Sequence, residues 1–175
     1  MTAGRMTPQS GAQAVSWLGG SVHHILLDAA ATEGRLSVFR STMHAPAAAP
    51  VYVHDHEDET VHVLSGTAVF WAGADRWDLG PGDTVFLPLG LPHAYVITSE
   101  AAEIITVCNP GGTEELFRAA GWDLSEPMPD GWQVDMDVLA AAGRATGQRV
   151  LGPPLAAGDA MPETYLKTLL PDAAG

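Results

Sequence analysis

The hydrophobic and polar positions in the middle of this chain follow the short period of β-structure. Brief runs of apolar and β-branched residues alternate with clusters of Gly, Pro and Asp, which is typical of strands joined by tight turns. The predicted strands are Ser21–Leu27, Arg35–Ser41, Val51–His56, Thr60–Leu64, Thr67–Trp71, Thr84–Leu87, Ala94–Thr98 and Glu103–Cys108. Because they follow one another over about ninety residues with no helical period between them, the pattern predicts an all-β sandwich or barrel.

The period changes after Asn109–Gly112. Thr113 is a candidate N-cap with two glutamates behind it, and the apolar residues that follow are spaced for one face of a helix. A second short helix is predicted at residues 134–145. We therefore expect a flexible arm (residues 1–14), a barrel (15–112), a helical C-terminal extension (113–155) and a tail (156–175). The tail is rich in Ala, Gly and Pro, so local packing, packing on a second subunit and disorder all stay open for it.

Composition narrows the classes of partner. The 175 residues are 46% hydrophobic, which is enough for a core, and 8 Lys and Arg against 21 Asp and Glu give a net charge of −13. A chain this acidic disfavours nucleic acid and anionic membranes. Cys108 is the only cysteine, so no intramolecular disulfide is expected. No apolar run is long enough to cross a membrane and no secretory leader is recognisable at the start, so we expect a cytoplasmic protein.

One segment carries candidate chemistry. Tyr52, His54 and His56 alternate along a predicted strand, so their side chains point to the same side. Glu59 follows across a turn, and His93 ends a segment rich in Gly and Pro. Three imidazoles and a carboxylate form a mixed nitrogen and oxygen donor set, which suits one divalent ion of Ni, Fe, Mn, Cu, Co or Zn.

The alternative is an acidic surface loop. Asp55, Glu57 and Asp58 interrupt the histidines, and a charge run is usually solvated. We expect these three carboxylates to lie on a solvated rim even where the histidines bind a metal.

The second segment, together with the first, resembles the two sequence motifs of the cupin superfamily. Gly82, Pro88, Gly90 and His93 keep the spacing of the second motif, and Ile97 stands where that motif has Asn. The resemblance implies an all-β cupin barrel, which is a double-stranded β-helix or jelly roll, followed by a short C-terminal helical extension.

The first motif is matched with one departure, which leaves two alternatives. Glu59 and Gly66 keep the six-residue gap of the motif, but only two residues separate His56 from Glu59, where the family has three or four. If the turn is shortened, the metal ligands are His54, His56, Glu59 and His93. If the segment is aligned without a gap, His54 takes the place of the family's second histidine and Tyr52 that of the first. Tyr52 is then a distal ligand or hydrogen-bond partner, and His56 lies outside the metal shell.

Over residues 15–154 the order of elements resembles bacterial single-domain quercetin 2,3-dioxygenase-like cupins. The resemblance implies a dioxygenase that acts with O2 on a small enolisable or aromatic molecule, with Glu59 as catalytic base. A metal-dependent cyclase or isomerase of natural-product biosynthesis is the alternative, as is a non-catalytic small-molecule-binding cupin. Cupins of this kind commonly pair, so we expect a homodimer.

Four aromatic residues give a weaker indication of the site. Phe39, Phe70, Phe86 and Tyr95 are candidates for lining an apolar pocket, although core packing explains them as well.

Three further histidines lie on predicted strands. His23 and His24 are adjacent and point to opposite sides, so at most one of them reaches the cavity. His62 is expected to be a partly exposed or hydrogen-bonded structural residue.

Overall fold

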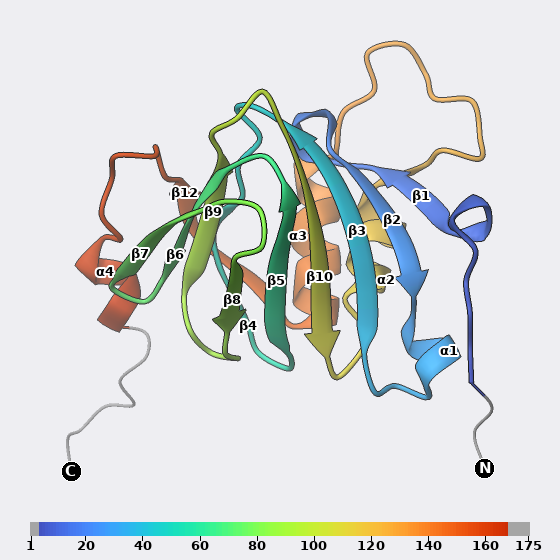
Figure 1. Ribbon diagram of the computed structural model, residues 1–175, viewed down its shortest axis with the longest axis horizontal. Helices are drawn as coiled ribbons and strands as arrows, with labels where there is room; N and C mark the ends of the chain where they lie inside the picture. The colour runs from blue at the N-terminus through green and yellow to red at the C-terminus, as the bar shows by residue number, and fades with distance from the viewer. Residues whose placement is uncertain (1–3, 168–175) are drawn as a thin grey trace.

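The computed structural model describes residues 4–167, which form two antiparallel β-sheets packed face to face (Figure 1). The larger sheet has the strand order β11-β1-β2-β3-β10-β5-β8, and the smaller has β12-β4-β9-β6-β7. The strands are β1 (Gln13–Ser16), β2 (Val22–Leu27), β3 (Ser37–His44), β4 (Pro50–His54), β5 (Asp58–Ser65), β6 (Ala68–Ala72), β7 (Asp75–Leu79), β8 (Thr84–Leu87), β9 (His93–Ile97), β10 (Ala101–Asn109), β11 (Trp122–Asp123) and β12 (Gln148–Pro154). The helical elements are η1 (Gln9–Gly11), η2 (Leu18–Gly20), α1 (Ala29–Thr32), α2 (Glu114–Ala120), α3 (Met136–Thr146) and α4 (Glu163–Leu166).

The all-β fold class is confirmed, and each of the eight predicted strands overlaps an observed one. The pattern does not predict β1, β7, β11 and β12. In β7 only Leu79 is buried, because this strand lies at the edge of its sheet and is held by backbone pairing with β6. An exposed edge strand has no apolar alternation from which it can be recognised.

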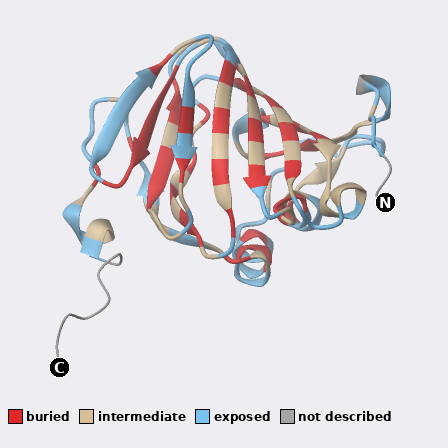
Figure 2. Cartoon of the chain, turned by 60° about the horizontal axis from the view of Figure 1, so that its bottom comes forward, coloured by how far each residue is buried: buried red, intermediate tan, exposed pale blue. Residues whose placement is uncertain are grey.

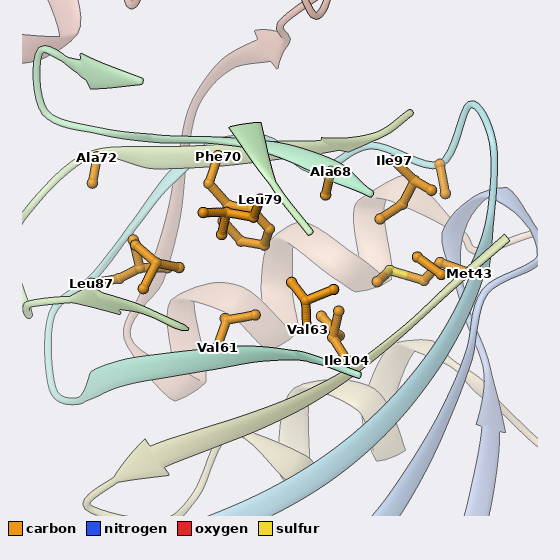
Figure 3. Close-up of a cluster of buried hydrophobic side chains, with 13 residues drawn as sticks. Met43, Val61, Val63, Ala68, Phe70, Ala72, Leu79, Leu87, Ile97 and Ile104 are labelled. Carbon is orange, nitrogen blue, oxygen red and sulfur yellow. The ribbon is translucent and has the colours of Figure 1, made fainter. Parts of the chain in front are cut away.

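The core lies between the two sheets. Buried side chains alternate with half-buried ones along β3 and β10 (Figure 2), as expected for strands with one face on a core. Met43, Val63 and Ile104 from the larger sheet meet Phe70 and Ile97 from the smaller sheet in one cluster (Figure 3).

The tail covers the outer face of the smaller sheet. Leu155 and Met161 pack with Val69 and Trp71, which lie on the outer side of β6. The indole Nε1 of Trp71 donates a hydrogen bond to the carbonyl of Asp159 at 3.0 Å. The described part of the tail therefore packs on its own chain, which is one of the three alternatives left open by the sequence. Residues 168–175 lie outside the described part of the chain.

The C-terminal extension is helical only in part. Helices α2 and α3 pack together with Trp17 over an apolar cluster, and Asp135 caps α3 by accepting hydrogen bonds from the backbone of the first turn. Residues 148–154, expected within the helical extension, instead form β12 and pair with β4. Because β12 is an edge strand, it tolerates Pro153 and Pro154, which cannot donate a backbone hydrogen bond. Within residues 4–167 no helix is long and apolar enough to cross a membrane.

Candidate metal centre

A cavity of about 390 Å³ opens between the two sheets and is bordered by α2, α3 and β12. Its walls are largely aromatic and aliphatic, and they include Phe39, Phe70, Tyr95 and Tyr52 as expected. The prediction for Phe86 is wrong, since its side chain is 57% exposed. Strand β8 turns the residues on either side of Phe86 inward, and alternation along the strand therefore points Phe86 to solvent.

Three potential metal ligands come together beside this cavity, and two of them, His54 and Glu59, line it. His54 ends β4, Glu59 lies near the start of β5, and His93 begins β9. All three are buried, and one ligand atom of each lies within 4.8 Å of the others. Strands β4 and β9 are paired at Tyr52 and His93, so neighbouring strands bring together residues that lie far apart in the sequence.

The carboxylate of Glu59 is the centre of the group. Its Oε2 lies 3.1 Å from Nε2 of His54, 3.5 Å from Nε2 of His93 and 3.3 Å from the hydroxyl of Tyr52. The two imidazole rings are nearly parallel, with centroids 5.2 Å apart and planes at 7°. Both histidines therefore present the same ring nitrogen to the same carboxylate oxygen.

The opposite ring nitrogens are fixed by acceptors. Nδ1 of His93 lies 2.8 Å from the carbonyl oxygen of Leu91, so Nδ1 carries the proton and the neutral ring offers a lone pair at Nε2. Nδ1 of His54 lies 2.7 Å from a carboxylate oxygen of Glu57. Histidines that bind metals are usually held in this way by a carboxylate or a backbone carbonyl.

This arrangement fits a cation. Nε2 of His93 is buried and has no hydrogen-bond partner among the described residues, although it faces Glu59. Without a metal, a proton between His54 and Glu59 offsets the carboxylate charge, and a divalent ion at the same point would replace that proton and also bind the unpaired Nε2 of His93. The residues His54, Glu59 and His93 thus have the geometry and the donor chemistry to hold a divalent transition metal.

Burial and the contacts among His54, Glu59 and Tyr52 also set the pKa values of these residues. Burial favours neutral His54, but its hydrogen bonds to Glu57 and Glu59 outweigh burial and raise its pKa to about 9. Burial would raise the pKa of Glu59, and its interactions with His54 and His93 lower it well below the ordinary value. Burial and the nearby charge of Glu59 raise the pKa of Tyr52, so its hydroxyl stays protonated and can donate to Glu59.

His56 is not brought into this group. Strand β4 ends at His54, which is two residues earlier than predicted. After it, the backbone N–H of Asp55 donates a hydrogen bond to the carbonyl of Gly147 at 2.7 Å. The bend turns the side chain of His56 outward, where it is exposed and lies against Gly147. The geometry thus follows the gap-free alternative, in which Tyr52 occupies the place of the first histidine and acts as a hydrogen-bond partner of Glu59.

The expectation for Glu57 is wrong. Its side chain is buried rather than part of a solvated rim, with the residue 5% exposed. One oxygen of Glu57 accepts from Nδ1 of His54 and, at 2.8 Å, from the hydroxyl of Thr113. The predicted cap of α2 is changed as well, because Thr113 directs its hydroxyl to Glu57 and makes no capping hydrogen bond.

The three histidines His23, His24 and His62 agree with their expectations. His62 is partly exposed and bonds to the hydroxyl of Thr84 at 2.8 Å. Of the adjacent pair, His23 lines the cavity and His24 does not.

Comparison with known proteins agrees with this architecture. Residues 39–108 match the family model described as the cupin domain, and no curated protein matches the chain significantly. KdgF from Halomonas sp. superposes with a TM-score of 0.57 at 16% identity, over 64% of this chain and 98% of the other. The polyketide cyclase RemF from Streptomyces resistomycificus gives 0.52 at 19% identity, over 61% and 80% of the two chains. A predicted oxalate decarboxylase from Thermotoga maritima gives 0.56 at 18% identity, over 61% and 99%. Residues 39–108 are thus similar to the cupin domain, and the two-sheet barrel around them has the cupin fold.

Proposed function

We propose that this chain is a metal-dependent enzyme that acts on a small enolisable or aromatic molecule. The observation that carries the proposal is the convergence of three buried residues with metal-ligating atoms, two of which, His54 and Glu59, line an apolar cavity. His54, Glu59 and His93 would hold one divalent transition metal, and the ligand would lie against Phe39, Phe70 and Tyr95. A cavity of about 390 Å³ lies within the size range of small-molecule sites.

The bound metal would supply Lewis acidity to a chelating oxygen of the substrate. Glu59 is the proton acceptor in this proposal, because it is the carboxylate among the described residues that line the cavity. Tyr52 donates to the same carboxylate oxygen, so its hydroxyl orients Glu59 and can pass a proton to or from it. The apolar walls exclude water and thereby protect a reactive enolate from bulk proton exchange.

Within this class, a quercetin 2,3-dioxygenase-like reaction is our first candidate. Two histidines and one carboxylate with further coordination positions open are the donor set of many oxygenases that use non-haem iron. The aromatic walls suit a flat substrate, and the positions not taken by protein ligands would be available to substrate and O2.

A cyclase or isomerase is the second candidate, and Tyr52 favours it. A phenol hydrogen-bonded to the carboxylate places a proton donor and a proton acceptor side by side, which is what enolisation without O2 requires. The fold shared with the polyketide cyclase RemF is compatible with this candidate but does not select it, because many reactions share this fold.

Elemental analysis and oxygen uptake test the proposal together. The purified chain is expected to contain one equivalent of transition metal, which His54→Ala should lose and His56→Ala should keep. Oxygen uptake on addition of a flavonol, abolished by Glu59→Gln, supports the dioxygenase, whereas turnover under anaerobic conditions supports the cyclase. Absence of stoichiometric metal would overturn both candidates.

A further inference from the structure

His23 lies in the cavity wall on a different strand from the metal ligands. It is 5% exposed, and three neighbours fix its ring. Nδ1 lies 2.7 Å from the hydroxyl oxygen of Ser41, the ring stacks on Phe117 with centroids 4.3 Å apart, and Trp17 approaches edge-on at 6.0 Å. The imidazole is therefore held in one orientation by the stacked Phe117 ring, by Trp17 beside that ring and by the hydrogen bond to Ser41.

The free end of this ring is unpaired. Nε2 of His23 is buried and has no hydrogen-bond partner among residues 4–167. Buried polar atoms in folded proteins are nearly always paired, so an unpaired one that lines a cavity points to a ligand atom as its partner. Burial also lowers the pKa of His23 to about 3, which keeps the ring neutral near pH 7.

A neutral ring selects the type of group that binds it. If the Ser41 hydroxyl donates to Nδ1, Nε2 carries a hydrogen and needs an acceptor; in the other tautomer Nε2 is itself an acceptor. A ligand hydroxyl satisfies both tautomers, and a keto oxygen satisfies the first.

A second residue with an unpaired nitrogen, in this case a side-chain amide, lines the same cavity. Nε2 of Gln148 is buried without a partner in the described part of the chain, and Gln148 lies opposite His54 in the pairing of β12 with β4. The cavity thus offers unpaired polar atoms from both sheets, separated by aromatic walls, which suits a ligand with more than one oxygen substituent.

The sheet topology places His23 and the metal ligands at two ends of the cavity. Strands β3 and β10 separate β2, which carries His23, from β5, which carries Glu59. A ligand that contacts both therefore carries polar groups at opposite ends of its framework.

We propose that Nε2 of His23 forms a second polar subsite, which binds a hydroxyl or keto oxygen at the far end of a flat aromatic ligand. The inference rests on the proposed function in one respect, because the near end of the ligand is taken to lie at His54, Glu59 and His93. The substrate class is thereby narrowed to aromatic compounds with an oxygen substituent remote from the reacting group.

The test compares 2-naphthol with naphthalene as probes of the full-length purified protein, with dissociation constants measured by tryptophan fluorescence. Wild type is expected to prefer 2-naphthol. His23→Leu should weaken 2-naphthol binding by about three- to tenfold, the usual effect of one hydrogen bond, and leave naphthalene unchanged. His24→Leu is the matched control, because His24 is the adjacent histidine and lies outside the cavity wall; it should keep the preference, as should His23→Gln, which retains a polar hydrogen-bonding group.

A wild type without preference, or a preference that persists in His23→Leu, overturns the subsite. A measurement on wild type does not depend on the folding of any variant: the ¹⁵N resonance of His23 Nε2 should shift with 2-naphthol and not with naphthalene, and an unchanged resonance overturns the subsite too. Metal content is determined on the same preparations. A metal-free protein that still shows the His23-dependent preference refutes the proposed function alone, and a metal-loaded protein without the preference refutes the subsite alone.

Discussion

Replacing Glu57 with Gln removes one negative charge beside His54 and keeps the size of the side chain. One oxygen of Glu57 accepts hydrogen bonds from Nδ1 of His54 at 2.7 Å and from Thr113 at 2.8 Å. The amide oxygen of Gln can accept the same two hydrogen bonds, so the orientation of the ring is retained. The variant therefore isolates the charge of Glu57 from its role in holding the ring.

The expected magnitude follows from these contacts. A hydrogen bond to an ionised partner is roughly twice as strong as a neutral one, and changes to such supporting residues typically lower metal affinity by about 10- to 100-fold. Because Glu57→Gln keeps the geometry, we expect a loss near tenfold, which is about 1.4 kcal/mol of binding free energy. Glu57→Ala also loses the orientation of His54, and we expect a loss of about 100-fold.

The assay is competition for Co²⁺ or Zn²⁺ against a chromophoric chelator. Asp58→Asn is the matched control, because it makes the same carboxylate-to-amide change one residue away, where Asp58 accepts a hydrogen bond from the backbone of Leu89. Equal metal affinity of wild type, Glu57→Gln and Glu57→Ala would refute the reasoning that Glu57 supports a metal ligand. An equal loss in Asp58→Asn would show that general acidity of the segment, rather than the contact with His54, sets the affinity.

His54→Ala is expected to lose stoichiometric metal in elemental analysis while His56→Ala keeps it, because His54, unlike His56, faces Glu59; loss in both variants would contradict the ligand set. Tyr52→Phe should keep the metal and lower turnover by about 10- to 100-fold, since it removes a hydrogen bond to an ionised group, and wild-type turnover would exclude Tyr52 from the proton path. In urea denaturation, Phe39→Ala should lower the free energy of unfolding by about 3 kcal/mol, and Phe86→Ala by less than about 0.5 kcal/mol. The two values differ because Phe39 is 1% exposed and Phe86 is 57% exposed. Similar losses of unfolding free energy in the two variants would contradict this difference in burial.

The fold was predictable where apolar alternation defines a strand. Strands β3 and β10 alternate between buried and more exposed positions along nearly their whole length, and their positions follow from the sequence pattern alone. Strand β12 lacks this pattern, because none of its residues is buried, only Gln148, Leu151 and Gly152 are half-buried, and it contains two prolines. Its position depends on backbone pairing with β4, which a periodicity of side chains does not reveal.

The candidate site was predictable as far as its donors lie on regular strands. His54, Glu59 and His93 come from the motif spacing, and the structure brings them together. Glu57 was misjudged because its burial depends on Thr113, which lies 56 positions further along the chain. Alternation predicts that at most one of His23 and His24 reaches the cavity, but it does not predict how the ring of His23 is oriented, because Ser41 and Phe117 from other elements fix that ring.

The position of His56 illustrates how a distant segment decides between two local alternatives. On a strand extended to residue 56, its ring would lie on the same side as His54. The strand ends earlier because Asp55 turns toward the segment after α3: its backbone bonds to Gly147, and its carboxylate receives two hydrogen bonds from Arg149 at 2.7 and 2.8 Å. Arg149 lies 94 positions beyond Asp55, and no local spacing reports it. The C-terminal extension thus contributes to the candidate metal centre without supplying a ligand. It holds the bend after His54, which directs His56 away from Glu59, and Tyr52 rather than His56 contacts the Glu59 carboxylate.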